Sequence, residues 1–121
     1  MASTKRPPVQ RGEVWIVALD PIIGSEQAKT RPCVIVQRDS ANGAAPTTIV
    51  VPFTGASIAT SIIAPRVPEG DGGLAKDSIA LCHQVRVVDR QRMRARLGQL
   101  TDSSMQAICA GLETILDLAN T

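Results

Sequence analysis

The sequence predicts a small, mainly β domain of the α+β class, in which a curled antiparallel sheet or small barrel is followed by one C-terminal helix. Short apolar runs rich in Val and Ile recur along most of the 121-residue chain. Gly- and Pro-bearing polar stretches separate them, too short for the helical crossovers of a parallel sheet. The length suits one compact domain, which we expect at residues 11–121, behind a mobile segment at 1–10.

The predicted strands share β-branched or apolar residues and are bounded by turn residues. They are Glu13–Leu19, Arg31–Gln37, Thr47–Phe53, Ile62–Val67, Ser78–Val88 and Arg94–Leu100. Pro65 marks an edge strand, because proline cannot donate to a β-ladder. Ser78–Val88 is expected to be one strand with a bulge near His83, and Asp89–Arg92 a helical turn.

The last element has helical periodicity. From Met105 onward the apolar residues recur every three or four positions, at Ile108, Cys109, Leu112, Ile115, Leu116 and Ala119. Such spacing is typical of an amphipathic helix that packs on a core. Thr101 or Asp102 is expected to cap its start.

Composition limits the possible functions. Trp15 and Phe53 are the only aromatic residues, so extensive base stacking on a single-stranded nucleic acid is excluded. Three cysteines lie in apolar runs, which indicates reduced core residues of a cytoplasmic protein. One histidine and no paired cysteines argue against a zinc site. The N-terminus lacks the apolar region of a signal peptide, and no segment is long enough to span a membrane.

A candidate anion site lies around Arg31. A polar loop with Gly24 and Ser25 ends there, and Pro32 biases Arg31 toward an extended backbone. Its guanidinium stays protonated and offers a rigid donor fork that matches phosphate. If the third strand lies beside the second, the hydroxyl of Thr54 shares a sheet edge with Arg31. The alternative is an exposed arginine at a strand edge.

Other motifs are open to two readings. His83 could act as a general acid or base, or be a histidine at a strand bulge that is hydrogen-bonded to the backbone. Gly70–Gly73 has turn chemistry, since no helix or Lys-Ser pair follows it as in a phosphate loop. The arginines at 86, 90, 92, 94 and 96 could follow a nucleic-acid backbone or an acidic partner. They could also form a solvated strand face, with Arg94 and Arg96 outward and Ala95 and Leu97 inward.

The order and spacing of several motifs resemble the MazF/PemK family of toxin endoribonucleases. These motifs are R-G-E-V-W at 11–15, L-D-P at 19–21, G-S-E-Q at 24–27, R-P-C-V-I-V-Q at 31–37, V-P-F-T at 51–54 and D-S-I-A-L…Q-V-R ending at Arg86. The resemblance covers roughly residues 11–119. It implies an SH3-like/CcdB-like small β-barrel with a C-terminal helix, working as a homodimer.

The resemblance also implies an activity: cleavage of single-stranded RNA at short sequences, with no metal or other cofactor, by a type II toxin. Arg31 and Thr54 match the catalytic pair of the family. Its RNA-contacting positions correspond here to Ser25, Glu26, Gln27, His83, Gln84 and Arg86. Position 83 is often acidic in relatives and is a histidine here, so base preference cannot be transferred. The implied partner is a small acidic, MazE-like antitoxin.

Two alternatives come from other classes of protein. Toxins of the same fold poison DNA gyrase without chemistry, but they depend on a tryptophan near the C-terminus, and this chain ends L-D-L-A-N-T. A non-catalytic RNA- or protein-binding module on an SH3-like barrel would bind without turnover.

Overall fold

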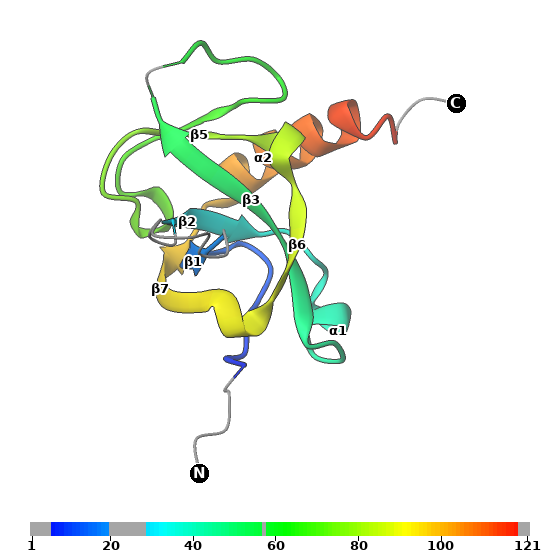
Figure 1. The fold of residues 1–121 in the computed structure, drawn as a ribbon. Helices are drawn as coiled ribbons and strands as arrows, with labels where there is room; N and C mark the ends of the chain where they lie inside the picture. Colours follow the sequence, from blue (N-terminus) through cyan, green and yellow to red (C-terminus); the bar gives the residue numbers. More distant parts are fainter. Residues whose placement is uncertain (1–5, 20–28, 57, 119–121) are drawn as a thin grey trace, which may run out of the picture.

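The computed structural model of the chain describes residues 6–19, 29–56 and 58–118 (Figure 1). Its strands are β1 (Glu13–Ala18), β2 (Thr30–Ile35), β3 (Thr47–Gly55), β4 (Arg66–Val67), β5 (Ser78–Ala80), β6 (Arg86–Asp89) and β7 (Met93–Gln99). Its helices are α1 (Asp39–Asn42) and α2 (Asp102–Ile115), and short 3₁₀ turns lie at η1 (Asp71–Gly73), η2 (Cys82–Gln84) and η3 (Arg90–Arg92). The predicted class, mainly β with a C-terminal helix, is confirmed.

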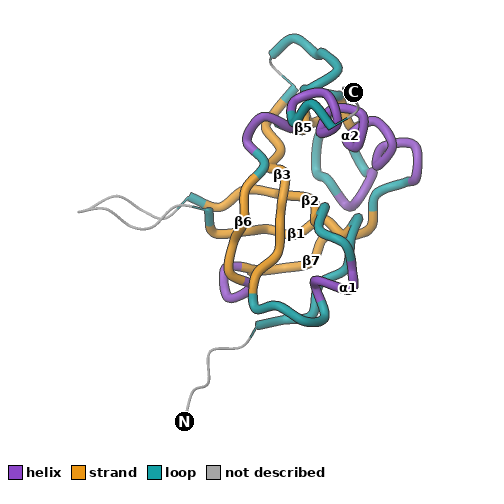
Figure 2. The backbone as a smooth tube through the Cα atoms, turned by 90° about the vertical axis from the view of Figure 1, so that its right-hand side faces the viewer, coloured by secondary structure: helices purple, strands orange, loops and turns teal. Residues whose placement is uncertain are grey.

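The strands form one sheet that bends strongly upon itself. Its order is β4-β5-β3-β2-β1-β7, and β6 also pairs with β3. Figure 2 shows β3 and β6 running across the direction of β1, β2 and β7, with α2 on one side. Among the described residues no ladder joins β7 to the far edge, so the sheet curls without closing. That arrangement agrees with an SH3-like fold.

The expected single strand at Ser78–Val88 is interrupted. Phe53 pairs with Ala80 and Val50 pairs with Arg86, so the chain advances six positions where β3 advances three. The turn η2 takes up the surplus, which is more than a bulge of one residue can do. The interruption falls at His83 as predicted, but it divides the strand into β5 and β6.

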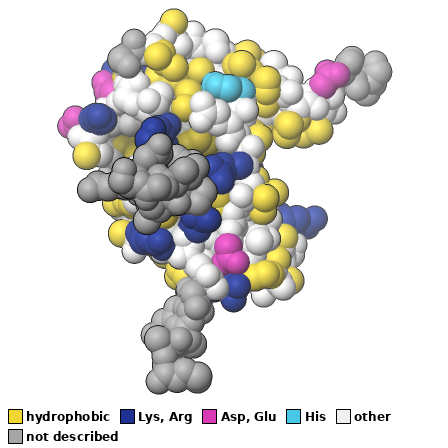
Figure 3. Space-filling view, viewed as in Figure 1, with side chains coloured by type: hydrophobic (Ala, Val, Ile, Leu, Met, Phe, Trp, Pro, Cys, Tyr) yellow, Lys and Arg dark blue, Asp and Glu magenta, His cyan; other side chains and the backbone are white. Residues whose placement is uncertain are grey.

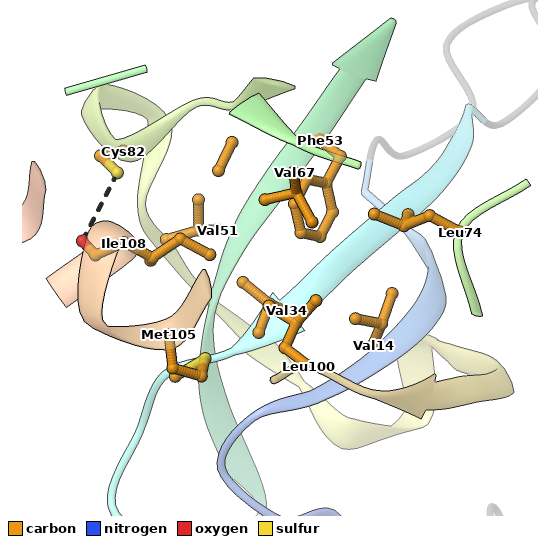
Figure 4. Packing of buried hydrophobic residues seen from close by; sticks show 11 residues of the cluster. Val14, Val34, Val51, Phe53, Val67, Leu74, Cys82, Leu100, Met105 and Ile108 are labelled. Atoms are coloured by element: carbon orange, nitrogen blue, oxygen red, sulfur yellow. Dashed lines mark hydrogen bonds between the residues drawn. The ribbon is translucent and has the colours of Figure 1, made fainter. Parts of the chain in front are cut away.

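Two apolar clusters cover opposite faces of the central strands, because successive side chains of a strand point to opposite sides. One cluster contains Val14, Val34 and Val51 and packs against Met105 and Ile108 of α2 (Figure 4). The other contains Trp15, Cys33 and Val50 inside the curl of the sheet; its remaining members are Val9, Val17, Leu19, Ile35, Val88 and Met93. Burial on both faces explains why these strands are almost continuously apolar.

Residues 6–10, which were assigned to a mobile N-terminal segment, lie against the sheet. Val9 is buried in the second cluster, and the Arg90 guanidinium donates to the carbonyl of Pro7 at 2.9 Å. Arg6 forms an ion pair with Asp89 at 3.0 Å. An apolar residue at position 9 therefore anchors this segment, and we propose that the folded domain begins near Arg6 rather than at Arg11.

Most of the arginine series serves the fold. Arg92 donates to the carbonyl of Ala18, Arg94 to that of Gln91, and Arg96 pairs with the buried Glu13 at 2.7 Å. The inward direction expected for Ala95 is wrong, since Ala95 is exposed. Register shifts between β1 and β7 break the simple alternation there.

Asp71 joins the η1 turn to the start of α2. Thr101 caps the helix by accepting from the Ser104 amide, and the Asp71 carboxylate accepts from the amide and hydroxyl of Thr101, each at 2.9 Å, and from the Ser104 hydroxyl. Gly72 lies at φ 63° beneath Val14 and Leu100, where a side chain would not fit. The prediction of turn chemistry for this glycine-rich segment is confirmed.

Replacement of Asp71 by Asn is expected to lower the free energy of unfolding by about 1–2 kcal/mol, since an amide cannot accept all three bonds. Burial raises the pKa of Asp71, but hydrogen bonds from Ser104 and Thr101 outweigh it and hold the pKa below its ordinary value of 3.8. The carboxylate therefore stabilises the fold above that value, and its contribution fades as pH falls through the lowered pKa.

Urea unfolding at several pH values measures this difference. The difference in the free energy of unfolding between Asp71→Asn and wild type should be largest at pH 7 and should decrease in acid. Glu69→Gln, an exposed carboxylate in the same turn region, is the matched control and should change little. An equally large difference in the free energy of unfolding at pH 7 and at the lowest pH would contradict the role of the charge.

In the described residues no helix is both long and apolar enough to cross a membrane.

Candidate active site

The sheet brings Arg31 and Thr54 together. β2 and β3 are antiparallel neighbours, with Cys33 opposite Pro52 and Val34 opposite Val51. Continuing this register by two residues places Arg31, near the start of β2, opposite Thr54, near the end of β3. Directly opposed residues share a face of a sheet, so the expected proximity of the two side chains at one sheet edge is confirmed.

Both residues line one pocket at this end of the sheet. The pocket has a volume of about 220 Å³ and is formed by Arg31, Pro32, Phe53, Thr54, Gly55, Lys76 and Ser78. Pockets that enclose a whole small ligand are usually larger, about 300–1,000 Å³. This one suits a single charged group of a longer substrate.

The pocket holds two cations that have no partner among the described residues, the Arg31 guanidinium and the Lys76 amine. Of the other Lys and Arg side chains that the structure describes, only those of Lys29 and Arg38 likewise form no hydrogen bond or ion pair. Two other hollows contain arginines that are engaged: Arg90 beside α1 and Arg66 at the start of α2. Within the described residues, positive charge is therefore uncompensated in the pocket of Arg31 and compensated in the two other hollows.

The Cys33 thiol, two residues after Arg31 on β2, does not neutralise the positive charge of Arg31. Burial raises the pKa of the Cys33 thiol to about 12, although the positive charges of Arg31 and Arg86 act in the opposite direction. Cys33 is thus uncharged at neutral pH. Arg86 lies opposite Val50 in the sheet and does not line the pocket.

His83 and Gln84 stand apart from the pocket lining. Both are exposed on η2, and neither contributes to the pocket of Arg31. In the described part of the chain the His83 ring forms no hydrogen bond, so the backbone-bonded alternative is not realised. Figure 3 shows the histidine in cyan on the same face as a group of Lys and Arg side chains.

The other predicted contact residues, Ser25, Glu26 and Gln27, lie outside the described residues, and nothing follows about their placement. Within the described ranges no three His, Cys, Asp or Glu side chains gather as a metal site would require. Metal-independent chemistry stays a prediction.

Among the pocket residues that were not predicted, Lys76 and Ser78 carry polar side chains. Ser78 belonged to a motif that carried the family resemblance, and Lys76 precedes it by two positions. In the sequence, the feature that could have indicated them is a cation and a hydroxyl residue just before the apolar run at residues 79–82. It identifies a site only once β5 is known to lie beside β3.

Comparison with known proteins agrees with this geometry. The model of PemK-like, MazF-like toxins of type II toxin–antitoxin systems matches residues 10–116. The endoribonuclease MazF of Staphylococcus saprophyticus is 35% identical over 114 residues, which cover 91% of this chain and 92% of that protein.

Solved structures share the fold at lower identity. The MazE–MazF complex of Deinococcus radiodurans (Form II) has a TM-score of 0.77 at 18% identity, covering 93% of this chain and 98% of that one. A mycobacterial endoribonuclease in complex with its cognate antitoxin has a TM-score of 0.74 at 20% identity, covering 91% and 96%. The family match over nearly the whole chain decides the assignment: this protein belongs to the PemK-like, MazF-like toxins of type II toxin–antitoxin systems.

Proposed function

We propose that the protein is a sequence-specific endoribonuclease toxin that cleaves single-stranded RNA, mRNA in particular, without a metal. The observation that carries the proposal is the guanidinium of Arg31, which has no partner among the described residues and lies beside Thr54 in a small cationic pocket. The relative from Staphylococcus saprophyticus, named an endoribonuclease, supports the same activity.

The reaction is an intramolecular transfer at phosphorus. The ribose 2′-oxygen loses its proton and attacks the adjacent phosphorus, and the bond from phosphorus to the 5′-oxygen breaks as that oxygen gains a proton. The products carry a 2′,3′-cyclic phosphate, or the 3′-phosphate formed from it by water, and a 5′-hydroxyl. The protein must align the attack and stabilise the extra charge on the non-bridging oxygens.

Arg31 stabilises that charge. A guanidinium is not deprotonated in proteins and is therefore a poor base, whereas its planar donors can hold two phosphate oxygens at once. Pro32 directs the backbone of Arg31 into the extended conformation, and pairing with Val17 of β1 fixes the strand. Thr54, held in β3 by pairing with Ile79 of β5, orients the phosphate through its hydroxyl.

The two proton transfers need further groups. His83 and Glu26 are the candidates, since imidazole and carboxylate groups commonly serve as general acids and bases in enzymes. Ser25, Gln27, Gln84 and Arg86 are assigned to RNA binding. Of these, Arg86 lies on β6, opposite Val50 of β3.

End-group mapping tests the proposal. Purified protein is incubated with mixed-sequence RNA in EDTA, and the fragment ends are determined. We expect 5′-hydroxyl ends at a short common sequence. Binding without fragments would favour a non-catalytic RNA-binding module, and cleavage only after magnesium is added would favour attack by water. Inhibition of gyrase with intact RNA would favour the gyrase-poison alternative.

The expected partner is a small acidic antitoxin of the MazE type. Relatives of the same fold have been solved with a cognate antitoxin and as MazE–MazF complexes. A disordered acidic tail that folds onto the toxin would cover the cationic pocket and so block the RNA. We place the protein in the cytoplasm, where free cysteines such as Cys33 and Cys82 remain reduced.

We further propose that the protein works as a homodimer. The end of α2 exposes Ile115, Leu116 and Leu118, the last at 66% of its surface. Ile62 is also exposed, and its backbone carbonyl lies against Gly111 of α2. Neighbouring exposed apolar side chains of this size commonly mark an interface between subunits.

Replacement of Leu116 by Asp is expected to weaken dimerisation at least tenfold, because a charge would be buried in an apolar contact. Sedimentation or light scattering over a concentration series measures the dimer dissociation constant. Glu113→Gln, an exposed change on the same helix, is the control. Unchanged dimerisation of the Asp variant would place the interface elsewhere.

A further inference from the structure

We propose that Lys76 is a second phosphate-binding cation of this active site, contacting a non-bridging oxygen of the RNA phosphate that Arg31 holds. The inference rests on the proposed function and adds a catalytic residue that the sequence motifs did not indicate. Lys76 lines the pocket together with Arg31 and Thr54. In the described residues its amine has no ion-pair or hydrogen-bond partner.

The end of the Lys76 side chain lies beside Gly55, at van der Waals distance. A Cβ placed on Gly55 would lie 3.6 Å from the Lys76 amine and 3.8 Å from its Cε. The end of the lysine side chain therefore lies over the backbone of the residue that directly follows Thr54. Arg31 approaches from β2 and Lys76 from the segment before β5, with Thr54 on the strand between them.

The backbone around Lys76 is held in place. The Ser78 hydroxyl donates to the carbonyl of Lys76 at 2.9 Å, and Ser78 itself is buried and pairs with Gly55 in the sheet. These contacts tie the lysine backbone to the end of β3. The origin of the side chain is thereby fixed relative to Thr54, while its flexible stem can adjust to a substrate.

The carboxylate of Asp77, next to Lys76 in the sequence, binds other partners. Asp77 accepts from the amide of Glu69 at 2.8 Å and forms an ion pair with Arg66. These hydrogen bonds, from the Glu69 amide first and then from Arg66, hold the pKa of Asp77 below its ordinary value, so it is ionised and engaged. The positive charge of Lys76 is thus left available to the pocket although a carboxylate is adjacent in sequence.

A second cation fits the charge of the reaction. When the deprotonated 2′-oxygen attacks, the phosphorus centre gains negative charge on its non-bridging oxygens, and one guanidinium cannot face both sides of that centre. Arginine supplies a planar fork, whereas lysine supplies a compact point charge on a flexible stem. Lys76 donates one N–H to the oxygen away from Arg31, and it transfers no proton in this role.

The assignment is tested by measuring the rate of RNA cleavage by three variants: Lys76→Met, Lys76→Arg and Arg38→Met. Methionine keeps the apolar stem and removes the charge. Arg38 is an exposed cation outside the pocket that has no partner in the described part of the chain. Under single-turnover conditions at saturating RNA we expect about a 10- to 10²-fold slower cleavage for Lys76→Met, less than the 10²–10³ typical of an enclosed donor because solvent screens this amine. Lys76→Arg should recover most of the rate, and Arg38→Met should match wild type.

Binding gives a readout that does not depend on turnover. The affinity for an RNA with a 2′-deoxy nucleotide at the cleavage position is measured at several salt concentrations. Loss of one phosphate contact should reduce the slope of log K against log salt by about 0.7 for Lys76→Met, with no change for Arg38→Met.

The outcomes separate the two proposals. Wild-type cleavage and an unchanged salt slope for a folded Lys76→Met variant would overturn the assignment of Lys76 and leave the nuclease intact. A wild-type protein that does not cut RNA would overturn the proposed function first. If Lys76→Met fails to fold by circular dichroism, Lys76→Gln and Lys76→Arg take its place, and equal rates for these two variants would overturn the assignment.

Discussion

Arg31→Ala is expected to fold and to cleave RNA about 10²–10³-fold more slowly than wild type, the usual loss when one preorganised donor to a developing oxyanion is removed. The fold should tolerate the change, because the guanidinium makes no hydrogen bond or ion pair to any described residue. The free energy of unfolding should therefore change by no more than about 0.5 kcal/mol.

Single-turnover cleavage and urea unfolding measure the two quantities on the same preparations. Arg31→Lys separates charge from geometry: it retains the charge but not the fork, so its rate should fall between those of Ala and wild type. Arg38→Ala is the matched control for loss of one positive charge. A folded Arg31→Ala variant with wild-type cleavage would remove Arg31 from its central role.

An RNA in which the scissile nucleotide lacks its 2′-hydroxyl is expected to resist cleavage altogether. In the proposed reaction that oxygen is the nucleophile, so no other group of the pocket can replace it. Affinity should change little, because phosphate contacts supply most of the binding free energy. Cleavage is followed by gel electrophoresis and binding by fluorescence anisotropy on the same oligonucleotide.

The matched control carries the 2′-deoxy nucleotide one position away and should be cut at nearly the normal rate. Continued cleavage of the first oligonucleotide would show that water is the nucleophile. Loss of cleavage with both would indicate recognition of the neighbouring ribose and would require the cleavage position to be mapped again.

The parts of the fold that follow from local residue chemistry were predictable. Val and Ile runs identify the strands because they pack on both faces of a sheet, and the spacing from Met105 onward identifies α2 because it gives one apolar stripe. The juxtaposition of Arg31 and Thr54 also followed, since a strand start and the end of its antiparallel neighbour meet at one edge.

Other features depend on contacts that no local pattern encodes. The division of the strand at η2 follows from the path of β3, which turns between its pairing with β6 and its pairing with β5. Ala95 is exposed because bulges shift the register of β1 against β7. Lys76 lies beside Gly55 at the pocket, and Asp77 is bound elsewhere; neither relation is visible without the tertiary structure.

The most direct test is whether the Arg31 guanidinium contacts the scissile phosphate. Protein labelled with ¹⁵N at arginine is titrated with the uncleavable 2′-deoxy RNA, and the side-chain Nε–H signals are followed by NMR, with Arg31→Lys used for assignment. The account predicts that the Arg31 signal shifts in step with RNA binding while the Arg38 signal stays in place. A bound RNA that leaves the Arg31 signal unmoved would contradict it.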